Sequence, residues 1–282
     1  MKAPTRRQML KLGLAAGSAG AIGVPAYTYF VEPRWLRSSQ WRMEMPGAPT
    51  MRVLHLSDMH LSRHISLDFI GKAIDRGLAQ KPDLICLTGD FVTRDMHDAG
   101  AYSKLLSRLS DTAPTFAVTG NHDGGSWMAA RGGPDSPAAV LDVLANAKVR
   151  TLSNENAEFA LHGKSVDIIG VSDLWSRDLD PDAAFAEATS DIPRIVLSHN
   201  PDSKEQLANF SWNLLLSGHT HGGQLRIPIT GGTPFAPVRD RRYVHGLYPW
   251  EGRHLHITAG IGNLHGLRFN CRPEVSVLDI NS

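Results

Sequence analysis

The stretch MRVLHLSDMH, residues 51–60, combines a short apolar run with a polar Asp-Met-His ending. The same pattern returns in DLICLTGD at 83–90 and in TFAVTGNHD at 115–123. Apolar residues at helical spacing lie between the first two runs, at 67–80, and a second helical pattern at 102–109 separates the last two. Strand, helix, strand, helix and strand within about 70 residues predict a layered α/β fold.

The rest of the chain continues this alternation without a repeat or an evident linker. The sequence therefore predicts one domain over residues 40–282. Further short strands are expected at 40–45, 158–161, 165–171, 195–198, 214–216, 254–257 and 275–280, and further helices at 138–147, 181–189 and 204–208.

Polar residues able to bind a metal follow five of the predicted strands. The two later examples are SHN at 198–200 and GHTH at 218–221. Each motif is weak alone, because Gly-Asp and Asn-His-Asp are also common in turns. In open α/β sheets, however, sites collect at the carboxyl ends of strands, so five such endings would converge. The sequence predicts a shared metal site with the candidate ligands Asp58, His60, Asp90, Asn121, His199, His219 and His221.

The residue types indicate which metals would bind. Carboxylate, imidazole and amide oxygen suit borderline divalent cations such as Mn, Fe or Zn. Cysteine is absent from the set, which argues against a structural zinc site. Seven candidates are too many for one cation but suit two cations that share a bridging carboxylate. Two-metal sites with a spacing of about 3.5–4 Å activate water and clamp a phosphoryl group.

The ordered motifs D-M-H, G-D, G-N-H-D, S-H-N and G-H-T-H resemble those of the calcineurin-like metallophosphoesterases, from Arg52 to about the end of the chain. The resemblance implies a four-layer α/β/β/α sandwich and two divalent metal ions as cofactors. It implies a bridging Asp90, with the remaining ligands divided into Asp58, His60 and His221 for one metal and Asn121, His199 and His219 for the other. It also implies that His122 is a catalytic residue that binds no metal, with Asp123 orienting its ring.

Other segments resemble YaeI-type bacterial phosphodiesterases and their exported YkuE-type relatives. These segments are HNPDSKEQ at 199–206, GHTHGGQLRIP at 218–228, FAPV at 235–238 and GLRFNCRPEV at 266–275. The resemblance implies hydrolysis of a phosphodiester by metal-activated hydroxide, with phosphodiesters linked to envelope lipids among the candidate substrates. A pyrophosphatase acting on a nucleotide-sugar lipid such as a lipid A precursor, a phosphomonoesterase, and a metal-bound scaffold without catalysis remain alternatives.

Residues 1–30 are expected to be a targeting segment. TRRQMLK at 5–11 resembles a twin-arginine export signal, and an uncharged stretch follows at 12–30. Cleavage after Ala26 would release the domain, whereas a retained stretch of this length could anchor it. We therefore expect the twin-arginine export machinery as a partner. The expected location is the periplasm, or the outward face of the inner membrane.

Charge and composition exclude other classes. The 282 residues carry a formal net charge of +1, so nothing indicates a nucleic-acid surface.

Cys86 lies within an apolar strand pattern and is expected to be a buried free thiol. Trp127, Met128 and Trp175 follow strand ends and could form an apolar rim. The oligomeric state stays open.

Several arginines follow the last metal motif, and such side chains can pair with phosphate oxygens. Arg268 is the tentative choice for substrate binding. The roles of Arg226, Arg239, Arg241 and Arg242 stay open.

Overall fold

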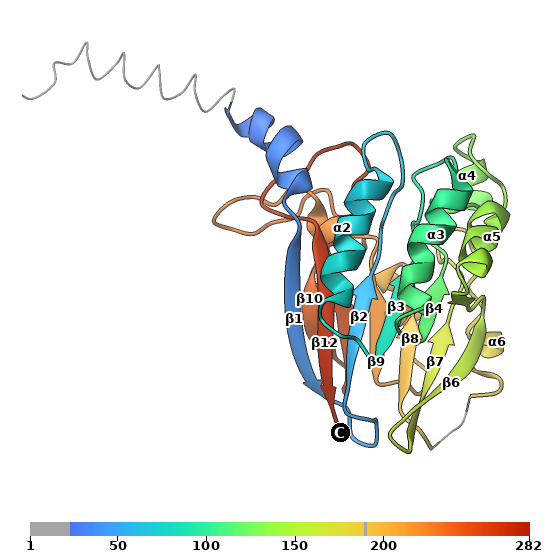
Figure 1. Cartoon of the computed structure of the whole chain (residues 1–282). Helices are drawn as coiled ribbons and strands as arrows, with labels where there is room; N and C mark the ends of the chain where they lie inside the picture. Colours follow the sequence, from blue (N-terminus) through green and yellow to red (C-terminus); the bar gives the residue numbers. More distant parts are fainter. Residues whose placement is uncertain (1–22, 189–190) are drawn as a thin grey trace, which may run out of the picture.

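The computed structural model of the chain describes residues 23–188 and 191–282. Two six-stranded sheets pack face to face, and helical segments cover the outer face of each (Figure 1). Three apolar clusters fill the spaces between these layers. The predicted four-layer α/β/β/α sandwich is therefore confirmed.

The first sheet holds the strands that were predicted from the opening motifs. The strand order is β1 (Arg37–Glu44), β12 (Glu274–Asn281), β2 (Met51–Leu56), β3 (Leu84–Thr88), β4 (Thr115–Val118) and β5 (Arg150–Thr151). Strands β2, β3, β4 and β5 are parallel, β12 runs antiparallel to β2, and β1 pairs in parallel with β12. Helices α2 (Leu67–Leu78), α3 (Ala99–Ser110) and α5 (Ala138–Asn146) contribute to the outer apolar cluster.

The second sheet carries a thinner outer layer. That layer contains the short helix α6 (Pro181–Phe185) and the 3₁₀ turn η3 (Pro201–Glu205). The strand order is β10 (Gly246–Trp250), β11 (Arg253–Ile257), β9 (Leu214–Ser217), β8 (Arg194–Leu197), β7 (Lys164–Gly170) and β6 (Glu155–Leu161).

Helix α2 shows why the opening part of the sequence folds as predicted. The Ser66 side chain accepts a hydrogen bond from the Phe69 N–H and caps the first turn. Ile70 and Ile74 lie one turn apart on one face, and both are fully buried. This apolar face secures the crossover between the parallel strands β2 and β3.

Several short elements differ from the prediction. The helix expected at 204–208 is instead η3, because Pro201 opens the turn and the Asn200 side chain caps it by accepting from Asp202 N–H. Strands β5 and β10 and the short helix α4 (Ser126–Ala129) were not predicted. Helix α6 ends at Phe185, before the expected 189, and residues 189–190 lie outside the described part of the chain. Cys86 is buried and free, as expected.

The described chain begins at Gly23 with helical turns that lie on the domain. Glu32 is buried and accepts hydrogen bonds from the backbone N–H groups of Asn270 and Cys271. The export signal and most of the expected anchor fall on residues 1–22, outside the described residues. Within residues 23–188 and 191–282, no helix combines the length and the apolar character needed to cross a bilayer.

Candidate metal centre

The predicted ligands converge on loops with an unusual backbone. Asp58, His60, Asp90, His219 and His221 all have positive φ angles, between 48° and 66°. Residues with a Cβ seldom adopt this left-handed region, and such strain gathers at functional sites. The sharp turns let these side chains leave the strand ends toward a common point.

Glycines in the same motifs allow the loops to approach closely. A Cβ on Gly218 would overlap the side chains of Ser57 and Asp58, and one on Gly120 would overlap the Asp90 carboxylate. These motifs therefore need glycine because ligand side chains occupy the space that a Cβ would take.

One group of ligand atoms comprises Asp58, His60 and His221, all buried. His221 Nε2 lies 3.5 Å from Asp58 Oδ1 and 3.2 Å from His60 Nε2. One atom from each residue lies within 4.8 Å of the others, which fits a single cation.

The second group comprises Asp90, His199 and His219 and is equally buried. His199 Nε2 lies 3.1 Å from both Asp90 Oδ2 and His219 Nδ1. Asp90 Oδ2 is also 3.4 Å from His60 Nε2 in the first group. A single carboxylate thus stands between the two groups, where a bridging ligand would be.

The remaining polar atoms of the site fit two cations. His199 Nδ1 lies 2.7 Å from the Thr88 carbonyl oxygen, and His219 Nε2 lies 3.1 Å from that of Pro237. Donation of one ring N–H to a carbonyl leaves the other nitrogen as a metal ligand. The buried Asn121 Oδ1 accepts no hydrogen bond, which fits a seventh ligand oxygen.

The electrostatics of the site also favour a cation. Burial lowers the pKa of His199, but the adjacent Asp90 carboxylate outweighs it and raises that pKa to about 10. Burial likewise opposes ionisation of Asp90, yet His199 and His122 hold the pKa of this carboxyl well below its usual range. The site therefore retains anionic charge that a proton or a metal can neutralise, and the two compete.

His122 lies beside the metal groups, but its ring belongs to neither. The backbone N–H of His122 donates to Asp90 Oδ1 at 2.9 Å, and the ring nitrogen Nδ1 lies 2.7 Å from the Thr93 carbonyl oxygen. The ring contacts Trp127 edge-on, with centroids 4.9 Å apart. Burial lowers its pKa. With Nδ1 bonded to Thr93, Nε2 is the nitrogen left to exchange a proton with a substrate.

Asp123 does not orient the His122 ring, contrary to the expectation from the sequence. Its carboxylate accepts hydrogen bonds from the backbone N–H groups of Asp90, Phe91, Val92 and Gly120, and none from the His122 ring. Burial and the nearby Asp90 charge raise its pKa to about 7. Asp123 therefore positions the two loops that carry Asp90 and Asn121, and the Thr93 carbonyl orients the ring.

The structure also corrects the expectation for Arg268. This side chain is fully buried, and its guanidinium donates to the carbonyls of Ala259, Gly260, Gly262 and Cys271. Because these carbonyls surround it, Arg268 cannot reach a substrate phosphate and instead holds the loop after β11. The sequence did not distinguish it from an exposed arginine.

A cavity of about 650 Å³ adjoins the second group. The expected aromatic rim is met by Trp127 and Trp175, and the Trp175 ring meets the His219 ring edge-on at 4.2 Å. Met128 is buried and is not among the lining residues. Two arginines, Arg177 and Arg239, also line the cavity. Aromatic faces and guanidinium groups beside a metal centre suit an anionic substrate.

Two residues of the site, Asp173 and Thr93, were not predicted from the sequence. Asp173 is buried near His199, and burial raises its pKa. It follows β7, so the rule that polar residues gather at strand ends would have found it. Thr93 belongs to none of the predicted motifs, yet its carbonyl oxygen lies 2.7 Å from His122 Nδ1 and its hydroxyl 3.3 Å from His60 Nδ1.

The fold and this centre define a metal-dependent phosphoesterase. Residues 51–223 match the family model of the calcineurin-like phosphoesterases, and the chain belongs to this family. It is 41% identical to phosphodiesterase YaeI of Escherichia coli, over 98% of this chain and 99% of that protein. It is also 30% identical to the metallophosphoesterase YkuE of Bacillus subtilis, over 100% and 99% respectively. Identity to the UDP-2,3-diacylglucosamine pyrophosphatase LpxG of Chlamydia trachomatis is 24%, over 95% and 98%.

Proposed function

We propose that the protein hydrolyses phosphodiesters at this two-metal centre. The observation that carries the proposal is the position of Asp90 between two buried histidine groups, with His122 beside them. The similarity to YaeI, a phosphodiesterase by name, supports the diester as substrate. Retention of His122 and of all seven candidate ligands argues against a scaffold without catalysis.

The residues of the chain divide the work of this reaction. The two ligand groups would hold two divalent cations, which would supply an activated water and neutralise phosphate charge. Asp90 holds the two ligand groups together, while Asn121 contributes a neutral oxygen. His122 donates a proton from Nε2 to the leaving oxygen when its ring is in the doubly protonated imidazolium form, and the Thr93 carbonyl orients the ring through Nδ1. Arg177 and Arg239 contact the charged part of the substrate that extends into the cavity.

A paired assay tests the proposal. The protein is supplied with Mn and given a chromogenic phosphodiester or the matching monoester, before and after chelation. We expect hydrolysis of the diester to exceed that of the monoester and to vanish with chelator. Preference for the monoester would favour a phosphomonoesterase, and inactivity towards both esters and towards a pyrophosphate, with metal bound, would favour the scaffold.

A pyrophosphate linked to a lipid is the second candidate. The similarity to LpxG, a UDP-2,3-diacylglucosamine pyrophosphatase by name, supports it, as do two arginines and two tryptophans around one cavity. Two arginines can pair with two phosphoryl groups. Hydrolysis of a UDP-sugar lipid faster than a simple diester would establish this substrate, and equal or slower hydrolysis would contradict it.

Export by the twin-arginine route is a further part of the proposal, with the protein periplasmic or anchored facing outward. Arg6 and Arg7 motivate it. The route also suits an enzyme whose ligands meet only in the folded chain, because metal can bind before export. Arg6→Lys with Arg7→Lys should leave the protein in the cytoplasm, and normal export of this variant would contradict the route.

A further inference from the structure

Exposed large apolar side chains are confined to two segments of the described chain. Single exposed apolar residues are ordinary, but clusters mark interaction surfaces. Ile229, at the tip of the second segment, is fully exposed and has a φ of 73°, which a β-branched residue rarely adopts. The exposed residues are Val24, Tyr29, Phe30, Val31 and Trp35 in the first segment, and Ile227, Ile229 and Phe235 in the second.

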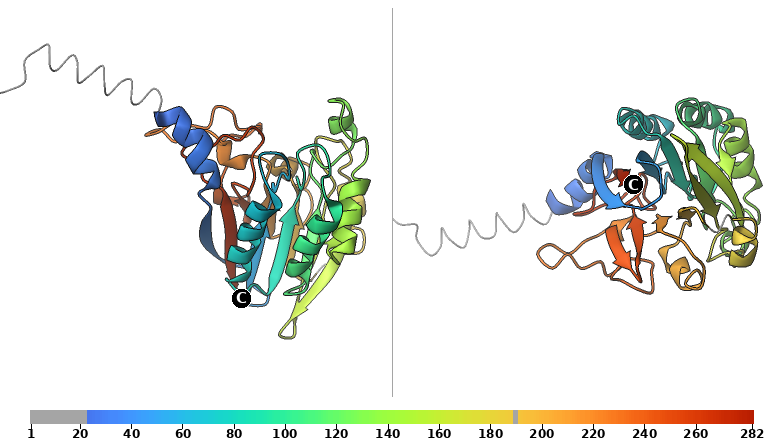
Figure 2. Two further views of the ribbon diagram at one scale, coloured as in Figure 1. Left: turned by 45° about the horizontal axis from the view of Figure 1, so that its top comes forward. Right: turned by 90° about the horizontal axis from the view of Figure 1, so that it is seen from below.

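The two segments flank one stretch of backbone. The Thr28 carbonyl accepts from Arg268 N–H at 3.1 Å, and the Phe269 carbonyl accepts from Arg226 N–H at 2.9 Å. Residues 268–269 therefore lie between them. The helical turns at 27–34 and the loop at 225–238 project on the same side of the domain (Figures 1 and 2). We call this surface, made of residues 23–36 and 224–239, the apolar face.

The charges of the apolar face have one sign. Its basic residues are Arg34, Arg226 and Arg239, and Arg272 lies next to Trp35. Its single acid, Glu32, is buried against the backbone N–H groups of 270 and 271 and adds no exposed negative charge. Apolar side chains beside the exposed Arg34 and Arg239 and the half-buried Arg226 and Arg272 match a surface of anionic lipid.

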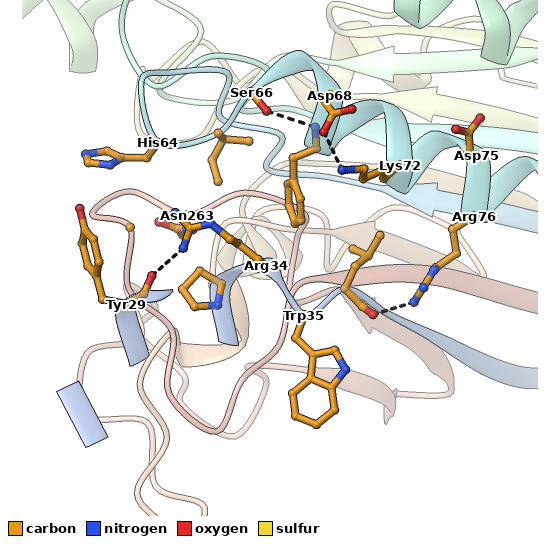
Figure 3. A pocket seen from close by; sticks show the side chains of 15 residues that line it. Tyr29, Arg34, Trp35, His64, Ser66, Asp68, Lys72, Asp75, Arg76 and Asn263 are labelled. Atoms are coloured by element: carbon orange, nitrogen blue, oxygen red, sulfur yellow. Dashed lines mark hydrogen bonds and ion pairs between the residues drawn. The ribbon is translucent and has the colours of Figure 1, made fainter. Parts of the chain in front are cut away.

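A cavity of about 730 Å³ lies between the first segment and α2 (Figure 3). Tyr29 and Trp35 stand on one side, and Lys72, which forms an ion pair with Asp68 at 2.7 Å, stands on the other with Asp75. Asn263, fully buried, lines it with both amide atoms unpaired. Aromatic rings of this kind collect at the boundary between water and lipid. The unpaired amide offers a donor and an acceptor to a polar lipid group.

We propose that the apolar face docks on the surface of an anionic phospholipid bilayer. Arg268 joins this face to the metal edge, since it bonds the carbonyls of Ala259 and His221, and its own N–H bonds Thr28. Docking would therefore hold the mouth of the metal centre beside the lipid surface. The inference rests on exposed side chains and charge, and it stands whether or not the substrate is a diester.

Vesicle binding by the full-length protein tests the inference. Partition onto vesicles of phosphatidylglycerol and phosphatidylcholine is measured for the wild type and for Ile227→Ser/Ile229→Ser/Phe235→Ser. We expect the triple variant to lose at least about tenfold in partition, because three apolar side chains leave the lipid interface. Residues 1–22 are present in both proteins, so their contribution is constant.

Two further comparisons separate the parts of the proposal. Arg226→Gln should weaken binding to anionic vesicles, whereas Lys104→Gln, an exposed charge on α3, should not. Bromolipid should quench wild-type tryptophan emission more strongly than that of Trp35→Phe. Metal content and circular dichroism report on folding.

Equal partition of the wild type and the triple variant would overturn the docking proposal. A second result would also overturn it: no vesicle binding by the wild type, together with a difference in oligomeric state between the wild type and the triple variant in light scattering. That result would show that the apolar face binds a second copy of the chain. Neither result depends on diester hydrolysis.

Discussion

Two buried polar clusters, one around Glu274 and the other at the metal centre, lie at the same edge of the sandwich and differ in how completely their polar atoms are hydrogen-bonded. At Glu274, the carboxylate accepts from Ala259 N–H and binds His245 Nε2, each at 2.7 Å, with Arg37 at 3.4 Å. At the metal centre, Asn121 Oδ1 and His221 Nδ1 have no hydrogen-bond partner.

The backbone differs in the same way. Glu274 begins the regular strand β12, whereas five candidate ligands have left-handed backbone conformations. The Glu274 carboxylate is satisfied within its own cluster, where only Arg37 Nε is left without a partner. Such pairing is expected of a structural cluster, because each unsatisfied buried group costs free energy. A ligand-binding cluster leaves atoms and charge for a partner and accepts strain to aim them. Substitutions in the two clusters should therefore have different consequences.

The largest effect is expected for Asp90→Ala. This change removes the carboxylate that both ligand groups share, so both metals and nearly all activity should be lost. Loss of groups that only support ligands costs about 10–100-fold in metal affinity, and loss of Asp90 should exceed this. Elemental analysis and calorimetric titration with Mn measure the effect. A variant that keeps two metals would contradict the bridging position.

His122→Ala should separate catalysis from metal binding. Metal content should stay near that of the wild type, while turnover falls by about 10²–10⁴-fold, the usual contribution of general acid–base assistance. The loss should be smaller for a nitrophenyl leaving group than for an alkoxide, which needs its proton more. A uniform loss for both leaving groups would argue against proton donation by this ring.

Asp123→Asn should weaken the centre without removing a ligand. Because Asp123 accepts four backbone N–H groups, the amide leaves some of them poorly paired and displaces the loops of Asp90 and Asn121. Metal affinity should fall by about 10–100-fold, and excess metal should restore most of the turnover. If saturating metal restores nothing, Asp123 acts in the reaction itself.

Glu274→Gln should affect stability and leave the metal count unchanged. The free energy of unfolding should fall by about 1–3 kcal/mol at neutral pH, because a buried charged acceptor is replaced. Denaturant unfolding with and without chelator measures this change. Loss of metal from this variant would show that the two clusters are not separate.

The smallest expected effect is the pH dependence of the difference in unfolding free energy between the wild type and Glu274→Gln. Burial opposes ionisation of Glu274, but His245 and Arg37 outweigh it and hold its pKa well below the usual range. Its contribution to stability is therefore present above the unfolded pKa of about 4.3 and is lost as the pH falls toward the folded pKa. The stability gap between wild type and Glu274→Gln, measured in chelator, should narrow from pH 5 to pH 3. A constant gap would contradict this assignment.

The sequence alone determined the sandwich and the two groups of Asp and His side chains that meet at its edge. Alternating apolar runs and helical patterns predict layers, and strands β2, β3, β4, β8 and β9 were located within one or two residues of their bounds. The ligands were predictable because parallel strands bring their carboxyl ends to one edge. A ligand must also be a particular residue type, so its identity is visible in the sequence.

Only the tertiary structure decided the roles that depend on backbone atoms and burial. The Thr93 carbonyl orients His122, and Asp123 binds backbone N–H groups; carbonyls and N–H groups occur at nearly every residue and leave no mark in a sequence. Arg268 was predicted to bind substrate, but in the folded chain it is fully buried and donates to backbone carbonyls. The apolar face likewise could not be predicted from the sequence. Its two segments, 23–36 and 224–239, are far apart in the chain and lie side by side only because both bond to residues 268–269. Exposure is a property of the folded chain.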